Sequence, residues 1–249
     1  MKRVVLLALC AALAVSCFSG CAIVNFSGWN MRTVTGTGHP ERYEITAGDY
    51  SRIRVSSFFN VHYYASSSDT VTLEVQPNLR EYIEVEVKGD ELIVGTKRGY
   101  NISVGSGRAP VLTVYAPVLT RLDISGAGSF TAYDKIAGDS FAIYLSGAGS
   151  GKAELDVSSF TVNVSGAGSF ELSGRAESAD FEMSGAGSLN ASALQTREAK
   201  VRLAGAGTVK IDCSEKLRID ASGVGTIEYS GSPSVDLNRA GMVTVRQVN

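Results

Sequence analysis

Hydrophobic and polar residues alternate through the C-terminal half of the chain, and glycine interrupts the alternation at regular intervals. The motif Ser-Gly-Ala-Gly-Ser occurs four times, and three weaker copies follow it. The seven copies begin at Ser125, Ser146, Ser165, Ser184, Ala204, Ser222 and Asn238. The steps between these starts are nearly constant and become shorter toward the C-terminus. A near-constant spacing of this kind indicates a repeat architecture.

The residues that flank each motif predict strands with one buried face. Relative to the first residue of a copy, the positions at −3, −1, +5 and +7 are mostly apolar, and those between them are mostly polar. In the copy at Ser165 the apolar positions hold Val162, Val164, Phe170 and Leu172. A period of two is the spacing at which a strand turns successive side chains to opposite faces.

The two glycines of each motif share the parity of the inward residues. We therefore expect both to face inward at a bend, where a Cβ would collide with the opposite wall. A second break is expected within each repeat, for example at residues 136–139 and 174–177. Each repeat would then hold two short strands.

A unit of about 19 residues cannot bury its own apolar face, so the repeats predict a stack. A propeller would need about 40 residues per blade and does not fit. The expected fold is all-β: a β-solenoid over residues 125–249, preceded by a strand-rich segment over 41–124. That segment contains a first copy of the frame around Ser56, without its glycines, and an inserted hairpin that turns at residues 88–91. Further strands are expected at 70–75, 83–87, 92–96 and 111–115, with one helical turn at 77–82.

The N-terminus has the pattern of a targeting segment. Lys2 and Arg3 precede an apolar run, Val4 to Val15, that is too short to span a bilayer. Cys17 and Cys21 each follow small residues in the manner of a bacterial lipobox, and one of the two is the predicted lipidation site. The alternative is an ordinary secretory peptide. Residues 1–21 thus form the predicted signal and lipobox region, and 22–40 a tether that joins a membrane anchor to the domain.

Composition excludes several other functions. The formal net charge of the 249 residues is −2 and no basic run occurs, so no nucleic-acid partner is expected. Cys213 is the one cysteine beyond the leader, and alternation places it in the core. The glycines lack the acidic residues of calcium-binding repeats, so we expect no metal and no cofactor.

Three segments together resemble a known family. They are the opening frame Tyr50-Ser-Arg-Ile-Arg-Val-Ser-Ser-Phe-Phe-Asn-Val, the hairpin from Val85 to Lys97, and the serial Ser-Gly-x-Gly copies. Over residues 41–249 the chain is similar to the head GIN domain family, a group of adhesin-type proteins common among Bacteroidetes lipoproteins. The resemblance implies a right-handed β-helix without catalytic residues. Many members carry Asp after the second glycine, whereas this chain has Ser or Thr there.

Two exposed surfaces are candidates for function. Strand alternation puts Phe58, His62 and Tyr64 on one face, which suits contact with a glycan or protein unless the face packs against the inserted hairpin. A second row contains Asp123, Glu182, Asp220 and Asp236, interrupted by Tyr144, Asn163 and Arg202. Polysaccharide lyases and hydrolases on β-helices need clustered carboxylates, and a mixed row is typical of a solvated face.

The sequence therefore favours a non-catalytic, lipid-anchored binding module of the cell envelope, adhesin-like and held at the outer membrane. The expected partners are the membrane, through the N-terminal lipid, and a glycan or protein ligand. The alternative is a carbohydrate-active enzyme on the same solenoid.

Overall fold

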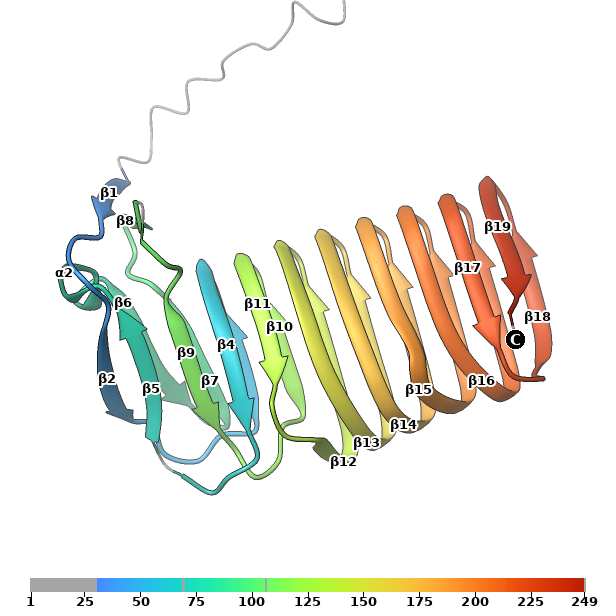
Figure 1. Cartoon of the computed structure of the whole chain (residues 1–249), viewed down its shortest axis with the longest axis horizontal. Helices are drawn as coiled ribbons and strands as arrows, with labels where there is room; N and C mark the ends of the chain where they lie inside the picture. The colour runs from blue at the N-terminus through green and yellow to red at the C-terminus, as the bar shows by residue number, and fades with distance from the viewer. Residues whose placement is uncertain (1–30, 69, 106, 249) are drawn as a thin grey trace, which may run out of the picture. The chain divides into compact units, whose positions relative to one another are not determined.

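The computed structural model describes residues 31–68, 70–105 and 107–248, and within it residues 33–249 form one compact unit. Cys17 and Cys21 lie outside the described residues. The described part is nearly all β, with one four-residue helix, α2 (Pro77–Arg80) (Figure 1). No helix in this part is long and apolar enough to cross a membrane.

The repeats form a stack of parallel rungs, which confirms the predicted solenoid (Figure 1). The strands are β10 (Arg121–Ile124), β11 (Ala127–Ala132), β12 (Ile136–Leu145), β13 (Ala148–Val164), β14 (Ala167–Met183), β15 (Ala186–Leu203), β16 (Ala206–Ala221), β17 (Val224–Ser230), β18 (Ser234–Arg239) and β19 (Met242–Gln247). Equivalent motif residues lie side by side: Gly149 pairs with Gly168, and Ser150 with Ser169. Inward residues of successive rungs therefore stack on one another and build a continuous core.

The core confirms the predicted alternation. On β13 and β14 the inward side chains Phe160, Val162, Leu172 and Phe181 are at most 1% exposed. Their rings form a ladder along the stack, because Phe160 lies 6.0 Å from Phe141 and 6.1 Å from Phe181 between ring centroids. Cys213 is also buried, as expected, and its thiol lies 3.2 Å from the Lys216 carbonyl oxygen.

The expected second break within each repeat is wrong for the middle rungs. Strands β13 to β16 run without interruption through this region, and the pairing of Val157 with Ala176 continues there. The chain bends where two successive residues are both exposed, as at Ser158 and Ser159. Neighbouring rungs bend at the same place, and their pairing resumes after the corner, where Ser159 pairs with Ser178.

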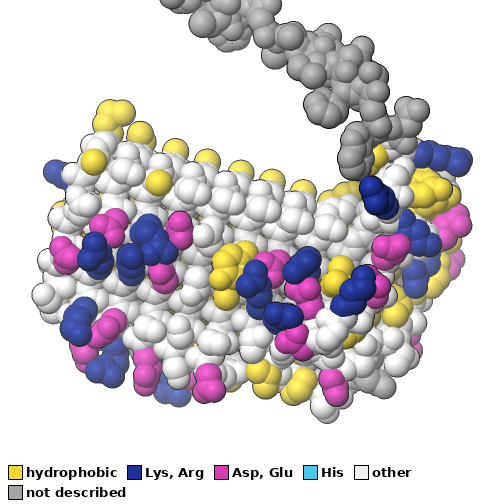
Figure 2. All heavy atoms as spheres, turned by 180° about the vertical axis from the view of Figure 1, so that it is seen from behind, with side chains coloured by type: hydrophobic (Ala, Val, Ile, Leu, Met, Phe, Trp, Pro, Cys, Tyr) yellow, Lys and Arg dark blue, Asp and Glu magenta, His cyan; other side chains and the backbone are white. Residues whose placement is uncertain are grey.

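The motif glycines are required for a different reason from the one predicted. A Cβ built on Gly166 would lie 1.8 Å from the carbonyl oxygen of Gly147, which belongs to the preceding rung. The obstacle is thus the neighbouring backbone along the stack rather than the opposite wall. The alanines between the glycines point outward and form the regular apolar row along one edge in Figure 2; they are Ala127, Ala148, Ala167, Ala186 and Ala206.

The last copy begins two positions later than the sequence suggested. Asp220 pairs with Asn238 and Gly223 lies beside Gly241, so the copy starts at Ala240 rather than Asn238. Asp236 consequently stands beside Arg218 instead of beside Asp220. The degenerate end of the repeat, which lacks the second glycine, concealed this register.

The N-terminal segment contains the first rung of the stack. Its strands are β1 (Arg32–Thr35), β2 (Glu41–Thr46), β3 (Arg52–Val55), β4 (Phe58–Tyr64), β5 (Thr70–Val75), β6 (Ile83–Lys88), β7 (Glu91–Thr96), β8 (Tyr100–Ser103) and β9 (Val111–Tyr115). Strands β3 and β4 form the first rung and pair in parallel with β10 and β11, which confirms the frame around Ser56. The β6–β7 hairpin turns at residues 89–90 as predicted. Part of the expected tether is a strand, because β1 pairs with β8.

Candidate functional site

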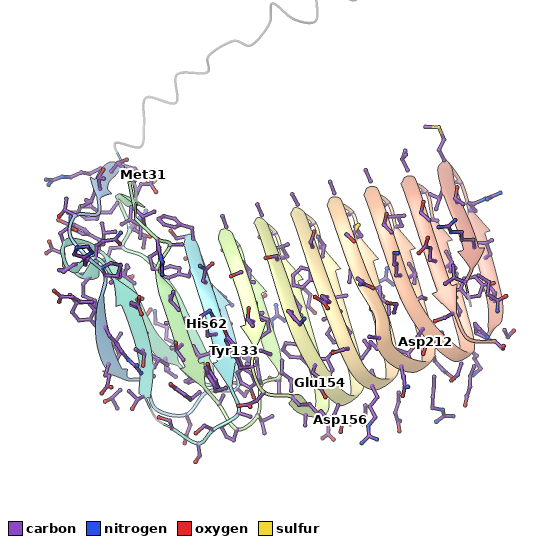
Figure 3. All side chains as sticks on the ribbon, in the orientation of Figure 1. Met31, His62, Tyr133, Glu154, Asp156 and Asp212 are labelled. Atoms are coloured by element: carbon purple, nitrogen blue, oxygen red, sulfur yellow. The ribbon has the colours of Figure 1, made fainter. Side chains whose placement is uncertain are left out.

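A cluster of aromatic side chains lies on the outer face where the N-terminal segment meets the first repeat. Tyr64 of β4 stacks between Tyr133, at 5.0 Å between ring centroids, and Tyr115 of β9, at 5.8 Å. The ring of His62 meets Tyr133 edge-on at 5.2 Å. Figure 3 shows His62 and Tyr133 next to each other on this face. We call these four residues the aromatic patch.

The patch brings together two of the three residues proposed from the sequence. Phe58 is partly buried and packs against the hydrophobic core, at the opposite end of β4 from Tyr64. Because Tyr64 is stacked on both sides, the patch offers mainly ring edges and phenol groups to solvent. Tyr133 is its most accessible member, at 54% exposure. Burial lowers the pKa of His62 and so favours the neutral form of its imidazole.

The sequence contained a signal for Tyr133 that the alternation argument overlooked. The repeat frame at Ser56 occurs again at Ser125. Tyr64 and Tyr133 have the same separation in sequence as these two serines, so they hold equivalent positions in successive copies. Tyr115 lies on β9, whose pairing with β4 depends on the inserted segment. No repeat offset predicts that pairing.

A second candidate surface is the row of carboxylates on the opposite side of the stack. Figure 2 shows acidic and basic side chains interspersed there, with neither sign dominating a large area. Each proposed carboxylate accepts a contact from an arginine: Asp123 from Arg121 at 2.6 Å, Glu182 from Arg202 at 2.9 Å, and Asp220 and Asp236 from Arg218 at 3.0 and 3.5 Å. The guanidinium of Arg121 also lies over the Tyr144 ring, 4.2 Å from its centroid.

Arginine pairing determines the chemistry that these carboxylates can perform. The hydrogen bond from Arg218 lowers the pKa of Asp220. Asp156, Glu215 and Glu228 also have lowered pKa values in the described residues, in each case first because an arginine donates a hydrogen bond. A general acid in glycoside hydrolysis needs a raised carboxyl pKa. These groups are instead held as carboxylates.

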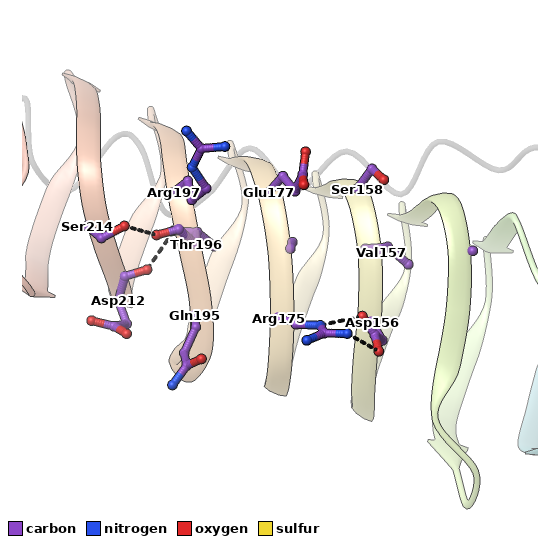
Figure 4. Close-up of a pocket in the computed structure, with 12 residues that line it drawn as sticks. Asp156, Val157, Ser158, Arg175, Glu177, Gln195, Thr196, Arg197, Asp212 and Ser214 are labelled. Carbon is purple, nitrogen blue, oxygen red and sulfur yellow. Dashed lines mark hydrogen bonds and ion pairs between the residues drawn. The ribbon is translucent and has the colours of Figure 1, made fainter.

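A groove with a volume of about 600 Å³ lies along one corner of the stack. Two rows of polar side chains border it (Figure 4). One row consists of Asp156, Arg175, Gln195 and Asp212; the other consists of Ser158, Glu177, Arg197 and Ser214. Between the rows lie the buried residues Val157, Ala176 and Thr196. We call this feature the corner groove.

Hydrogen bonds between rungs hold the walls of the corner groove. Arg175 donates to both oxygens of Asp156, at 2.6 and 3.0 Å, and Arg197 binds Glu215 in the same two-pronged way. The Thr196 hydroxyl donates to the Asp212 carbonyl oxygen at 2.6 Å. These contacts fix the side chains before any ligand arrives.

Sequence reasoning missed the corner groove, one end of which lies where the rungs are unequal. The register between β15 and β16 shifts between Ala191 and Gln195, and shifts again after Thr196. The available signal was the difference between two successive repeat steps, the longer from Ser184 to Ala204 and the shorter from Ala204 to Ser222. Regular alternation alone would place these residues on a featureless face.

In the described part of the chain, no three His, Cys, Asp or Glu side chains lie close enough together to bind a metal ion. The sulfur of Cys213 is buried in the core and faces backbone carbonyls. The described site chemistry is therefore that of hydrogen-bonding, aromatic and paired charged groups.

Comparison with known proteins gives one family and several similar folds. The family model described as "Putative auto-transporter adhesin, head GIN domain" matches residues 49–233. No curated protein matches the chain.

Among solved structures, a "putative adhesin" from Bacteroides fragilis has a TM-score of 0.78 and 20% identity, and the match covers 86% of this chain and all of the other. A "putative lipid binding protein" from Parabacteroides distasonis has a TM-score of 0.71 and 21% identity, covering 88% of this chain and all of the other. A "putative adhesin" from Parabacteroides merdae has a TM-score of 0.62 and 22% identity, with the same coverage. At these identities the likeness establishes the fold.

Proposed function

Because the chain belongs to the head GIN domain family, we propose that it is a non-catalytic binding module, lipid-anchored in the cell envelope, whose solenoid displays its surfaces to a ligand. Family membership favours an adhesin-like role at the envelope or cell surface. The lipobox pattern at Cys17 and Cys21 is the basis for the anchor. An acylated N-terminus would hold the protein at the outer membrane.

The observation that carries the non-catalytic proposal is the pairing of the exposed carboxylates. Asp123, Glu182 and Asp220 are each bound to an arginine. General acid–base work needs one carboxyl that is protonated near neutral pH beside another that is ionised. The arginine partner lowers the pKa of Asp220, and the contacts of all three carboxylates with guanidinium groups suit recognition of polar groups better than proton transfer.

The aromatic patch supports binding at the N-terminal end of the stack. It contains the exposed side chain of Tyr133, and aromatic groups with a polar tip favour contact with partly polar surfaces. A Tyr133→Ala change would weaken ligand retention there only partially, since Tyr64 and Tyr115 remain.

Acylation tests the anchoring part of the proposal. Cells that express the wild-type protein are labelled with palmitate, in parallel with Cys17→Ala, Cys21→Ala and the double variant. We expect labelling of the wild type and none of the double variant, while the single variant that retains label identifies the modified cysteine. Persistent labelling of the double variant, or release of the wild type into the soluble fraction, would contradict the anchor.

A further inference from the structure

We propose that the corner groove binds a linear, uncharged oligosaccharide whose chain runs along the stack. The inference rests on the proposed function, since it names the ligand class and the site of a binding module. The groove is about 600 Å³ in volume and extends over strands β12 to β16. It is thus within the range of sites that enclose small ligands.

The spacing of the groove's polar groups matches a linear sugar chain. Asp156, Arg175, Gln195 and Asp212 are contributed by four successive rungs, in register. Adjacent rungs are about 4.8 Å apart, so one polar group recurs at each such step. An extended chain of β-linked pyranose sugars advances by nearly this distance per sugar. A peptide strand advances by about 3.4 Å per residue and would fall out of step.

The chemistry of the walls also favours sugar hydroxyl groups. Carboxylates accept hydrogen bonds, whereas guanidinium and amide groups donate them. Two neighbouring groups in the wall can therefore bind one sugar hydroxyl, one by accepting from it and the other by donating to it. The Gln195 amide forms no side-chain hydrogen bond in the described part of the chain and lies in the middle of its row (Figure 4). It has both a donor and an acceptor to offer.

The charge of the groove argues against strongly charged glycans. The lining residues include three acids, Asp156, Glu177 and Asp212, and two bases, Arg175 and Arg197. Asp156 pairs with Arg175 and Arg197 pairs with Glu215, so the lining keeps a small negative excess. A polyanion would meet more like charges than opposite ones, and one excess acid attracts a polycation only weakly.

The test measures the binding of neutral oligosaccharides by calorimetry to the full-length protein. The probes are β-linked glucose, N-acetylglucosamine and xylose oligomers from disaccharide to hexasaccharide, with oligogalacturonate as a charged arm. We expect at least one neutral series to bind, with affinity rising up to about four sugars and then levelling off, because the groove spans about four rung steps. Oligogalacturonate should bind more weakly than that series.

Variants locate the binding. Arg175→Ala and Gln195→Ala should each weaken the best oligosaccharide about tenfold, the effect of losing about one hydrogen bond. Arg246→Ala is the matched control: it also removes an exposed arginine that is paired with an acid, Glu228, but one that does not line the groove, and should change affinity less than about twofold. All three positions are exposed, so melting curves should confirm folding.

The outcomes separate this inference from the proposed function. If no neutral oligosaccharide binds, or if Arg175→Ala and Gln195→Ala bind like the wild type, the corner groove is not the site. If an oligosaccharide binds and only Tyr133→Ala weakens its binding, the groove inference fails while the proposed binding module stands. Cleavage of the bound oligosaccharide would instead refute the non-catalytic function itself.

Discussion

Replacing Gly166 by alanine tests how the rungs are held together. A Cβ at this position would lie 1.8 Å from the Gly147 oxygen, whereas real Cβ atoms do not approach closer than 3.0 Å. The two rungs must therefore move apart by at least the difference between these distances. At the same place the Ala167 amide donates to the Gly147 oxygen at 2.9 Å. A separation of that size takes the pair outside hydrogen-bonding range.

The expected cost follows from these two effects. Overpacking costs about 1–3 kcal/mol, and the loss of a backbone hydrogen bond costs about 0.5–1.5 kcal/mol. The same movement of the rungs relieves the overpacking and breaks the hydrogen bond, so the total cost is smaller than the sum of the two upper values. We expect Gly166→Ala to lower the free energy of unfolding by about 2–4 kcal/mol. For a chain of this size the melting temperature should fall by roughly 4–16 °C.

Urea unfolding of the purified protein, followed by far-ultraviolet circular dichroism, measures this loss. Ala167→Ser is the matched control, because it also adds one heavy atom, at the next position along the chain, but on an exposed side chain. It should change the unfolding free energy by less than about 0.5 kcal/mol. Equal midpoints for the two variants would refute the close approach of the rungs at the motif glycines.

Two further predictions concern the aromatic residues. Burial lowers the pKa of His62, so the folded state favours the neutral ring, and the stability of the protein should fall as the pH drops below the unfolded pKa of about 6.5. Between about pH 7.5 and 5.5, the melting temperature of His62→Gln should therefore fall by less than that of the wild type. Equal falls would contradict the direction of the pKa shift. Phe160 is 1% exposed and lies between the rings of Phe141 and Phe181. Phe160→Ala should therefore lower the free energy of unfolding, measured in urea, by about 3–5 kcal/mol. A loss below about 1 kcal/mol would contradict the packing of these rings along the stack.

Much of the fold could be predicted because a strand's side-chain period is fixed and the repeats enforce one register. The placement of Val162 and Phe170 inside follows from alternation alone. The reason for the motif glycines did not follow, because a single repeat carries no information about the backbone beside it. Gly166 is constrained by Gly147, a residue of the previous copy.

The functional surfaces were less predictable because they arise from irregularities. One end of the corner groove lies where the register between β15 and β16 shifts, and a regular period does not predict such a shift. The aromatic patch required Tyr115, whose place beside Tyr64 depends on the fold of the inserted segment. Likewise, Asp236 could not be placed beside Arg218 because the last motif is too degenerate to fix its start.

The most direct test of a non-catalytic binding module is the size of polysaccharides after incubation with the protein. A panel of host and bacterial polysaccharides is incubated with the purified protein, and retention on the protein and fragment length are measured in the same samples. We predict that at least one polysaccharide is retained and that its length distribution is unchanged. Reproducible depolymerisation, abolished by a single change such as Asp156→Asn, Glu177→Gln or Asp212→Asn, would contradict the proposal and identify an enzyme.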